Sequence, residues 1–211
     1  KIFSAAKQRY EYIKLGNPLS DEQIKTMCKE IEPELGYKLS EVLYSVNPLL
    51  LPKATVNDDD LELLKQWDSV RYGVGDIVRS SIISGAWDGV MSVVWDSVWY
   101  SSGDSVLNSV ISKVSWDAGY SVKTRIWDSV WNSVGAYIGS MFPSINKWKY
   151  KNYEQGQYPF QSVVNLWYRG LVPSFDGDIW RLHSGEKAEV VWEEPEIGWL
   201  KATNLKRLKR R

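Results

Sequence analysis

The 211-residue chain has few of the side chains that most often do chemistry, with one cysteine, Cys28, and one histidine, His183. A single cysteine excludes an internal disulfide, and the two residues together fall short of the four ligands of a structural zinc site. A nucleophile–histidine–acid triad would need His183, for which we expect a structural or surface role in a strand. Glycine-rich phosphate loops and the G-x-S-x-G elbow are also missing. We therefore predict a protein that is not an enzyme and has no metal or cofactor.

Long apolar runs are absent as well, so the sequence predicts no transmembrane segment. Residues 1–16 are too charged to form the apolar core of a secretory signal, and we expect a cytoplasmic protein. The net charge is zero, but residues 143–211 carry an excess of four positive charges, concentrated after residue 200. This basic tail could hold nucleic acid or an anionic surface, or serve only solubility.

The sequence is rich in tryptophan, with 12 residues, and it contains a long repeat. From Trp67 to Phe142 the chain divides into 19 successive blocks of four residues, and W-D-S-V is the recurrent form. The fourth position is Val, Ile or Ala in 17 blocks, the third is usually Ser or Gly, and the first alternates between large apolar, glycine and basic residues. A frame held over this length predicts a repeat architecture.

The period of four decides the fold that we expect. On an α-helix the apolar stripe would drift by about 40° per block, which a straight helix cannot bury on one side. On a single strand the second and fourth positions would share a face, which would bury the aspartates with the valines. We therefore predict a mainly β repeat, a β-solenoid-like array with inward fourth positions. A bundle of short helices broken at the glycines is the alternative, and coils of 16 or 20 residues both stay open.

Helical signals precede the array, which begins at residue 67. Ser20 with Gln23 three residues on predicts a capping box before a helix Asp21–Glu32, and Asp58–Asp60 can cap a helix Leu61–Gln66. Residues 1–66 are therefore interpreted as a helical N-terminal cap, followed by the tetrad-repeat array 67–142.

Residues 143–158 are interpreted as a linker, and 159–200 as a small α+β module before the basic tail 201–211. In this module we expect a helix Phe160–Arg169, a hairpin around Asp176-Gly177, and a third strand Ala188–Trp192.

The W-D-S-V blocks resemble uncharacterised tetrad-repeat proteins of bacterial and phage genomes. Such arrays often end in a segment like Gly135–Ser140, and a module like Leu171–His183 follows them. The resemblance covers residues 67–192 and is specific as a pattern, but it implies no activity and gives no residue a role.

Candidate binding residues come from the array and the tail. First-position tryptophans can form an outer wall that stacks on sugars, bases or a partner protein, or they can cover seams of the solenoid. The residues concerned are Trp67, Trp87, Trp95, Trp99, Trp127 and Trp131, and the candidates in the basic tail are Lys206, Arg207, Lys209 and Arg210. Rows of second-position aspartates can bind Ca²⁺ or act as an acid pair, although corner residues that bond backbone amides explain them better.

We predict a non-enzymatic repeat scaffold or binding module that presents a tryptophan-rich surface to a macromolecule, either protein or nucleic acid. One alternative is a nucleic-acid-associated protein that uses the basic tail. Another is a self-assembling structural protein, because the ends of a solenoid expose strand edges. A monomer or a small homo-oligomer is expected, since the flanking regions look like caps.

Overall fold

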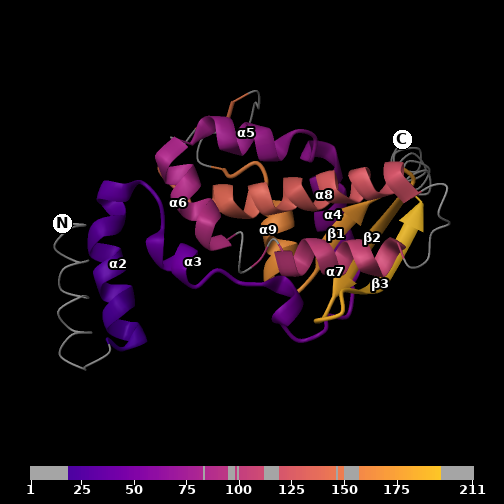
Figure 1. Ribbon diagram of the computed structural model, residues 1–211, viewed down its shortest axis with the longest axis horizontal. Coiled ribbons are helices and arrows are strands. Elements are labelled where there is room, and N and C mark those ends of the chain that lie inside the picture. The colour runs from indigo at the N-terminus through magenta and orange to yellow at the C-terminus, as the bar shows by residue number, and fades with distance from the viewer. Residues whose placement is uncertain are drawn as a thin grey trace, which may run out of the picture.

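The computed structural model describes residues 19–82, 84–94, 98, 100–111, 119–145, 147–149 and 157–195. In these residues the chain forms α2 (Asp21–Leu35), α3 (Leu39–Leu43), the 3₁₀ turn η1 (Pro48–Leu50), α4 (Asp58–Val70), α5 (Val74–Ser81), α6 (Ser84–Val94), α7 (Tyr100–Ile111), α8 (Gly119–Ser140) and α9 (Gln161–Tyr168). Three strands follow, β1 (Val172–Phe175), β2 (Ile179–Ser184) and β3 (Glu189–Pro195). The molecule is therefore mainly helical, with a small sheet near its C-terminal end (Figure 1).

The predicted β-solenoid is wrong, because the described part of the array forms the end of α4 and then helices α5 to α8. The open alternative of short helices agrees with the structure. The physical reason lies in the angle between positions of a block, since residues two apart on an α-helix point about 200° from each other. The helix therefore separates the second position from the fourth, as a flat strand cannot.

The burial of the array follows this separation. Eleven fourth-position residues are 1% exposed or less, namely Val74, Val78, Val90, Val94, Val98, Val106, Val110, Ile126, Val130, Val134 and Ile138. Second-position residues are exposed at ten described places, namely Tyr72, Asp76, Ser80, Asp88, Ser92, Asp104, Asn108, Tyr120, Thr124 and Asp128. The expectation of inward fourth positions is confirmed, although in helices rather than in a solenoid.

The drift of the apolar stripe is accommodated in two ways. Helices α5, α6 and α7 are only 8, 11 and 12 residues long. Each therefore ends before its stripe of apolar fourth-position residues has rotated away from the core. Helix α8 has 22 residues and contacts α5, α6, α7, α9 and β1, so neighbours cover it on several sides. A central helix can bury apolar residues all round. A repeat in sequence thus yields helices of different lengths rather than a repeated structural unit.

Glycine and tryptophan in the first position are complementary at the helix contacts. A Cβ on Gly103 of α7 would lie 3.2 Å from the Trp127 ring of α8, and a Cβ on Gly75 of α5 would overlap the Trp131 indole. A Cβ on Gly135 would stand 2.8 Å from the Gly75 Cα, so α5 and α8 cross with their backbones in near contact. Each glycine therefore makes room for a helix or an indole.

Third-position serines bond the helix backbone. The hydroxyls of Ser69, Ser109 and Ser133 donate to carbonyls three residues earlier, at 2.7, 2.9 and 2.8 Å. This bond satisfies a buried or half-buried hydroxyl inside a helix. The third position therefore contributes hydrogen bonds along the helices.

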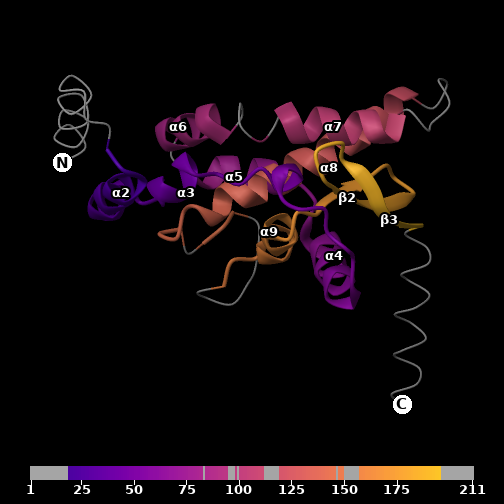
Figure 2. The same cartoon turned by 90° about the horizontal axis from the view of Figure 1, so that it is seen from below.

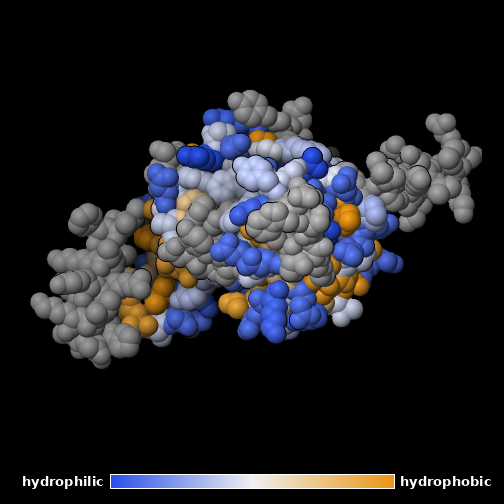
Figure 3. Space-filling view, turned by 45° about the vertical axis from the view of Figure 1, so that its right-hand side comes forward, coloured by the Kyte–Doolittle hydropathy of each residue, from blue (hydrophilic) through white to orange (hydrophobic). Residues whose placement is uncertain are grey.

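The helices are arranged in three layers. Seen from below, α6 and α7 form one layer, α5 and α8 the middle, and α9 with α4 the opposite side (Figure 2). The α2 helix lies at the end of the molecule far from the sheet (Figure 1). The face in Figure 3 is mainly hydrophilic, with hydrophobic residues in separate patches on the left and on the lower right of the view.

The antiparallel sheet has the order β1-β2-β3. The hairpin around Asp176-Gly177 and the third strand are confirmed, with Val172 opposite His183 and Phe175 opposite Trp180. The predicted helix before the hairpin is confirmed as α9. Because β1 and α9 pack on α8, this segment shares the core of the array.

Local cap signals are also confirmed at the N-terminal end. Ser20 and Gln23 form the predicted capping box of α2, which runs past Pro33 and ends at Gly36 in the left-handed conformation. For α4 the N-cap is Asn57 and Asp60 completes the box, so the helix begins before the predicted Leu61 and continues into the first block. The buried Asp60 carboxylate also accepts from Arg169 at 2.9 Å, which ties α4 to the end of α9.

No helix in the described residues has the length and apolarity that a membrane crossing requires.

Candidate binding site

The structure places the predicted tryptophans in and around the core. Trp67 and Trp87 are 0% and 5% exposed, so they cannot belong to an outer wall. Trp127 and Trp131 are half-buried against the core. Trp95 and Trp99, together with Lys206, Arg207, Lys209 and Arg210, lie outside the described residues. For the four described tryptophans, the alternative interpretation as packing residues fits better than an exposed row.

The second-position aspartates are exposed but do not converge. Among the described residues no group of three or more His, Cys, Asp or Glu side chains lies close enough to hold a metal ion. Asp68 instead binds Arg71 three residues on, with the guanidinium Nε 2.9 Å from the carboxylate. The idea of a row that binds Ca²⁺ therefore finds no support in this part of the chain.

A pocket of about 590 Å³ opens where α5, α8 and the β1–β2 turn meet. We call it the array pocket. Its walls combine cationic, anionic, aromatic and amide side chains, namely Arg71, Tyr72, Gly73, Asp76, Arg125, Asp128, Ser129, Trp131, Asn132, Phe175 and Gly177. Nine of the eleven belong to the tetrad array, and the other two come from the C-terminal hairpin. Neither region alone forms the pocket.

Arg71 forms one wall and is held from several sides. Its guanidinium lies 4.2 Å from the Tyr72 ring centre, 4.3 Å from that of Phe175 and 5.0 Å from that of Trp180. It donates to Asp68 at 2.9 Å and to the Tyr72 hydroxyl at 2.8 Å. Cation–π contacts and an ion pair together compensate the burial of this charge. The wall is therefore preorganised.

The opposite edge consists of Arg125 and the hairpin turn. Arg125 donates to the Asp176 carbonyl at 3.4 Å. Its side chain lies so close over Gly177 that any Cβ there would overlap the guanidinium, and Gly177 has φ 111°. The backbone angle requires glycine here, and the missing Cβ leaves room for the Arg125 guanidinium. This contact joins the N-terminal half of α8 to the sheet.

The floor of the pocket is the crossing of α5 and α8. The Gly75 N–H donates to Asn132 Oδ1 at 3.0 Å, and the Trp131 indole packs over Gly75. Ser129 is 6% exposed, and its hydroxyl has no hydrogen-bond partner among the described residues. The equivalent serines of other blocks bond the helix backbone. The Ser129 hydroxyl is thus a buried polar group beside the pocket whose hydrogen bond is unsatisfied in the described part of the chain.

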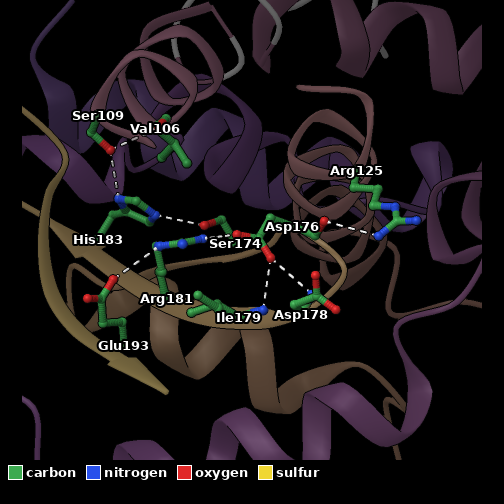
Figure 4. Close-up of polar contacts among 10 residues, drawn as sticks. All are labelled: Val106, Ser109, Arg125, Ser174, Asp176, Asp178, Ile179, Arg181, His183 and Glu193. Carbon is green, nitrogen blue, oxygen red and sulfur yellow. Dashed lines mark hydrogen bonds and ion pairs between the residues drawn. The ribbon is translucent and has the colours of Figure 1, made fainter. Parts of the chain in front are cut away.

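A polar network around the buried Arg181–Asp176 ion pair holds the hairpin turn in place (Figure 4). Arg181 lies between Asp176 and Glu193, with nitrogen–oxygen distances of 2.6 and 3.3 Å. The other Asp176 oxygen accepts from the Asp178 and Ile179 N–H groups at 3.0 and 2.8 Å. The guanidinium and the two backbone N–H groups therefore fix Asp176, and with it the position of Gly177 at the edge of the pocket.

The same contacts make stability depend on pH. Burial alone would raise the pKa of Asp176, but hydrogen bonds from Asp178, Arg181 and Ile179 outweigh it and lower the pKa below its usual 3.8. As pH falls, Asp176 is therefore protonated at a higher pH in the unfolded chain than in the folded protein. The stability that this carboxylate provides is present above about pH 5 and declines as pH falls through the lowered pKa. Urea unfolding between neutral pH and pH 3 should show this decline, and Asp176→Asn should flatten it. An unchanged slope in Asp176→Asn would contradict the role of Asp176.

His183 is fully buried and bonded through both ring nitrogens (Figure 4). Nδ1 lies 3.0 Å from the Ala188 carbonyl, which can only accept, so Nδ1 carries the proton. Nε2 lies 2.7 Å from the Ser174 hydroxyl, and Ser109 of α7 is 3.1 Å from Nδ1. Ser174 is also fully buried, so these contacts join α7 to the sheet rather than facing a ligand.

The sequence-based selection missed most residues of the array pocket because it followed the regular blocks. Blocks that depart from the W-D-S-V form supply Arg71 and Tyr72, from R-Y-G-V, and Arg125, from K-T-R-I, whereas Asp128 and Ser129 come from the regular block 127–130. Such departures are a usable signal, since a position outside the consensus is free of the packing rule. Among the predicted tryptophans that the structure describes, Trp131 alone lines the pocket, together with the second-position aspartates Asp76 and Asp128.

Comparison with known proteins finds no family model, no curated protein and no solved structure that matches this chain. The resemblance to W-D-S-V tetrad-repeat proteins therefore stays a prediction.

Proposed function

We propose that this protein is a non-enzymatic binding module whose array pocket receives a neutral, hydroxyl-rich ligand, such as a sugar unit of a glycan on a macromolecule. The observation that carries the proposal is the balance of the lining, which contains two arginines and two aspartates beside aromatic side chains. A lining of one sign would select an ion. A balanced set of donors and acceptors suits hydroxyl groups, which donate and accept at once.

The aromatic side chains support the same ligand class. Tyr72 is 67% exposed at the edge of the pocket, and Trp131 lies on its floor. Aromatic faces pack well against the apolar C–H faces of a sugar ring, while the polar groups around them bond its hydroxyls. A pocket of about 590 Å³ falls within the range of sites for small organic ligands.

A glycan array probed with the full chain tests the proposal, followed by calorimetric titration of the best saccharide. We expect Asp128→Asn and Tyr72→Ala to weaken binding about tenfold or more, since each removes one of the two kinds of contact. Matched controls are Asp104→Asn and Tyr120→Ala, which alter exposed second-position residues of α7 and α8 that do not line the pocket. The absence of saccharide binding, or equal losses in the controls, would refute the assignment.

Ser129→Ala offers a sharper variant, because it removes a buried hydroxyl that bonds no other group in the described residues. Its stability should stay within about 0.5 kcal/mol of the parent while saccharide affinity falls. Ser133→Ala removes a hydroxyl that donates to the Val130 carbonyl and lies outside the pocket, so it should leave affinity unchanged.

Turnover must be measured in the same experiment, since the pocket contains Asp76 and Asp128, and paired carboxylates can hydrolyse glycosidic bonds. If the parent releases reducing sugar and Asp128→Asn does not, the protein is a hydrolase rather than a binding module. Binding without release would support the proposal.

A further inference from the structure

A second hollow of about 310 Å³ lies where α2, α3, α8 and α9 meet. We call it the tyrosine groove. Three tyrosines and Val46 form its walls, while two lysines, Ser40 and Glu41 complete it; the full lining is Lys25, Lys29, Ser40, Glu41, Tyr44, Val46, Tyr137 and Tyr168. It shares no residue with the array pocket.

The floor of the tyrosine groove is rigid. The Tyr137 ring stacks on Trp167 at 5.1 Å and meets the Tyr168 ring edge-on at 6.1 Å. The Val46 N–H donates to the Tyr137 hydroxyl at 2.8 Å. Burial raises the pKa of Tyr137 to about 12 although the Val46 bond lowers it in part, so the hydroxyl stays neutral at physiological pH. A ligand would therefore meet an uncharged aromatic floor.

The rim of the groove is apolar and open to solvent. Tyr44 and Tyr168 are 39% and 48% exposed, and Leu43, which precedes Tyr44 in the chain, is 40% exposed. Exposed large apolar residues that gather around a hollow are typical of interaction sites rather than of ordinary surface. The surface thus offers an anchor site with an apolar border.

The two lysines of the groove can pair with a ligand more readily than its one glutamate can. Lys25 and Lys29 stand four residues apart on α2, on the same face of the helix. Glu41 is held by Lys38 at 2.7 Å, so its charge is compensated locally. Lys25 lies 3.8 Å from the exposed Glu22 carboxylate, a weak contact that a ligand can replace. The groove therefore presents two cations beside an apolar hollow.

We infer that the tyrosine groove docks an acidic amphipathic peptide segment of a partner protein. A large apolar side chain of that segment would occupy the hollow between Tyr44, Tyr137 and Tyr168. Flanking carboxylates would pair with Lys25 and Lys29. A buried anchor with charged neighbours is the usual composition of a helix-in-groove interface.

Charge distribution favours a peptide over a nucleic acid as the occupant. Helix α2 carries five acidic residues against its two lysines, namely Asp21, Glu22, Glu30, Glu32 and Glu34. Nucleic-acid affinity depends on many phosphate contacts, and beyond Lys25 and Lys29 the only charged side chains that this helix offers a phosphate backbone are acidic. Two local ion pairs suffice for a short peptide.

Two fluorescein-labelled probe peptides test the inference with the full chain. One has Leu and Trp at helical spacing, two Glu that flank the apolar positions and Gln elsewhere, and the other has Lys in place of each Glu. By fluorescence anisotropy we expect the acidic peptide to bind at least about tenfold more tightly than the basic one. The charge reversal Lys25→Glu/Lys29→Glu should invert this preference. Tyr168→Ala should weaken binding of the acidic peptide about tenfold.

Two control variants show whether peptide binding belongs to the groove. Lys123→Glu changes an exposed lysine of α8 away from the groove and should leave peptide binding unchanged. Asp128→Asn in the array pocket should do the same, so failure of the saccharide assignment would not affect this result. Equal binding of both peptides, an unchanged preference in the double reversal, or tighter binding of a thymidine oligonucleotide than of the acidic peptide would each overturn the inference.

Discussion

Replacing Gly135 with valine is expected to lower the free energy of unfolding by about 3 kcal/mol or more. A Cβ at this position would lie 2.8 Å from the Gly75 Cα and 3.3 Å from the Gly75 nitrogen, so the new atoms meet backbone that cannot rotate away. Overpacking of a core by a few methylenes costs about 1–3 kcal/mol, and it costs more where the backbone must move. Helix α5 would have to separate from α8, which also opens the floor of the array pocket.

Gly89→Ala is the matched control, because Gly89 lies in α6 and a Cβ at this position would have nothing within 4 Å. Alanine there should raise stability by about 0.5–1 kcal/mol through helix propensity alone. Guanidinium unfolding followed by far-ultraviolet circular dichroism measures both variants. A Gly135→Val protein as stable as the parent would mean that α5 and α8 do not cross at these glycines.

Arg181→Met is expected to destabilise the protein by about 3–5 kcal/mol. Arg181 and Asp176 have side chains only 10% and 9% exposed, at a nitrogen–oxygen distance of 2.6 Å. Removal of the cation leaves a carboxylate in a buried site, and such uncompensated charges are costly. The two backbone N–H donors of Asp178 and Ile179 remain, which keeps the loss from being larger.

A double-mutant cycle shows whether the loss comes from the stranded charge. Asp176→Asn in the Arg181→Met background removes that charge, so the double variant should regain part of the stability lost. Lys53 and Glu189 form the comparison pair, since their side chains are 54% and 55% exposed at 2.5 Å. Surface pairs of this kind contribute little. Additive effects of the two buried substitutions would contradict a direct interaction between Arg181 and Asp176.

Local signals in the sequence predicted local structure well. The capping box of Ser20 and Gln23, the helix before Gly170 and the hairpin around Asp176-Gly177 are all confirmed. Each rests on contacts between residues a few positions apart, so the information that decides it is present in one segment. Prediction failed where the decision was not local, in the array and in the binding pocket.

Two features of the array explain why its sequence pattern led to the wrong prediction of a β-solenoid. A straight helix with one buried side would expose part of a drifting apolar stripe, whereas Ile126 and Ile138 of α8 are both fully buried because several elements cover that helix. The poor helix propensity of serine and glycine was also outweighed. Serine hydroxyls such as that of Ser133 bond the preceding turn, and Gly135 permits a close crossing. Tertiary packing overrides propensities of less than about 1 kcal/mol per residue.

By itself, the sequence determined which face of each block is buried, because removing a fourth-position valine from water is favourable whatever structure surrounds it. It also determined the helix caps and the hairpin turn, which depend on bonds within a few residues. Only the tertiary structure decided that the blocks form helices and where those helices end. It alone brought Arg71, Arg125 and Gly177 to one pocket and Lys29, Tyr44 and Tyr168 to one groove. These residues are far apart in the chain, and their proximity follows from how complementary glycines and tryptophans let the helices pack.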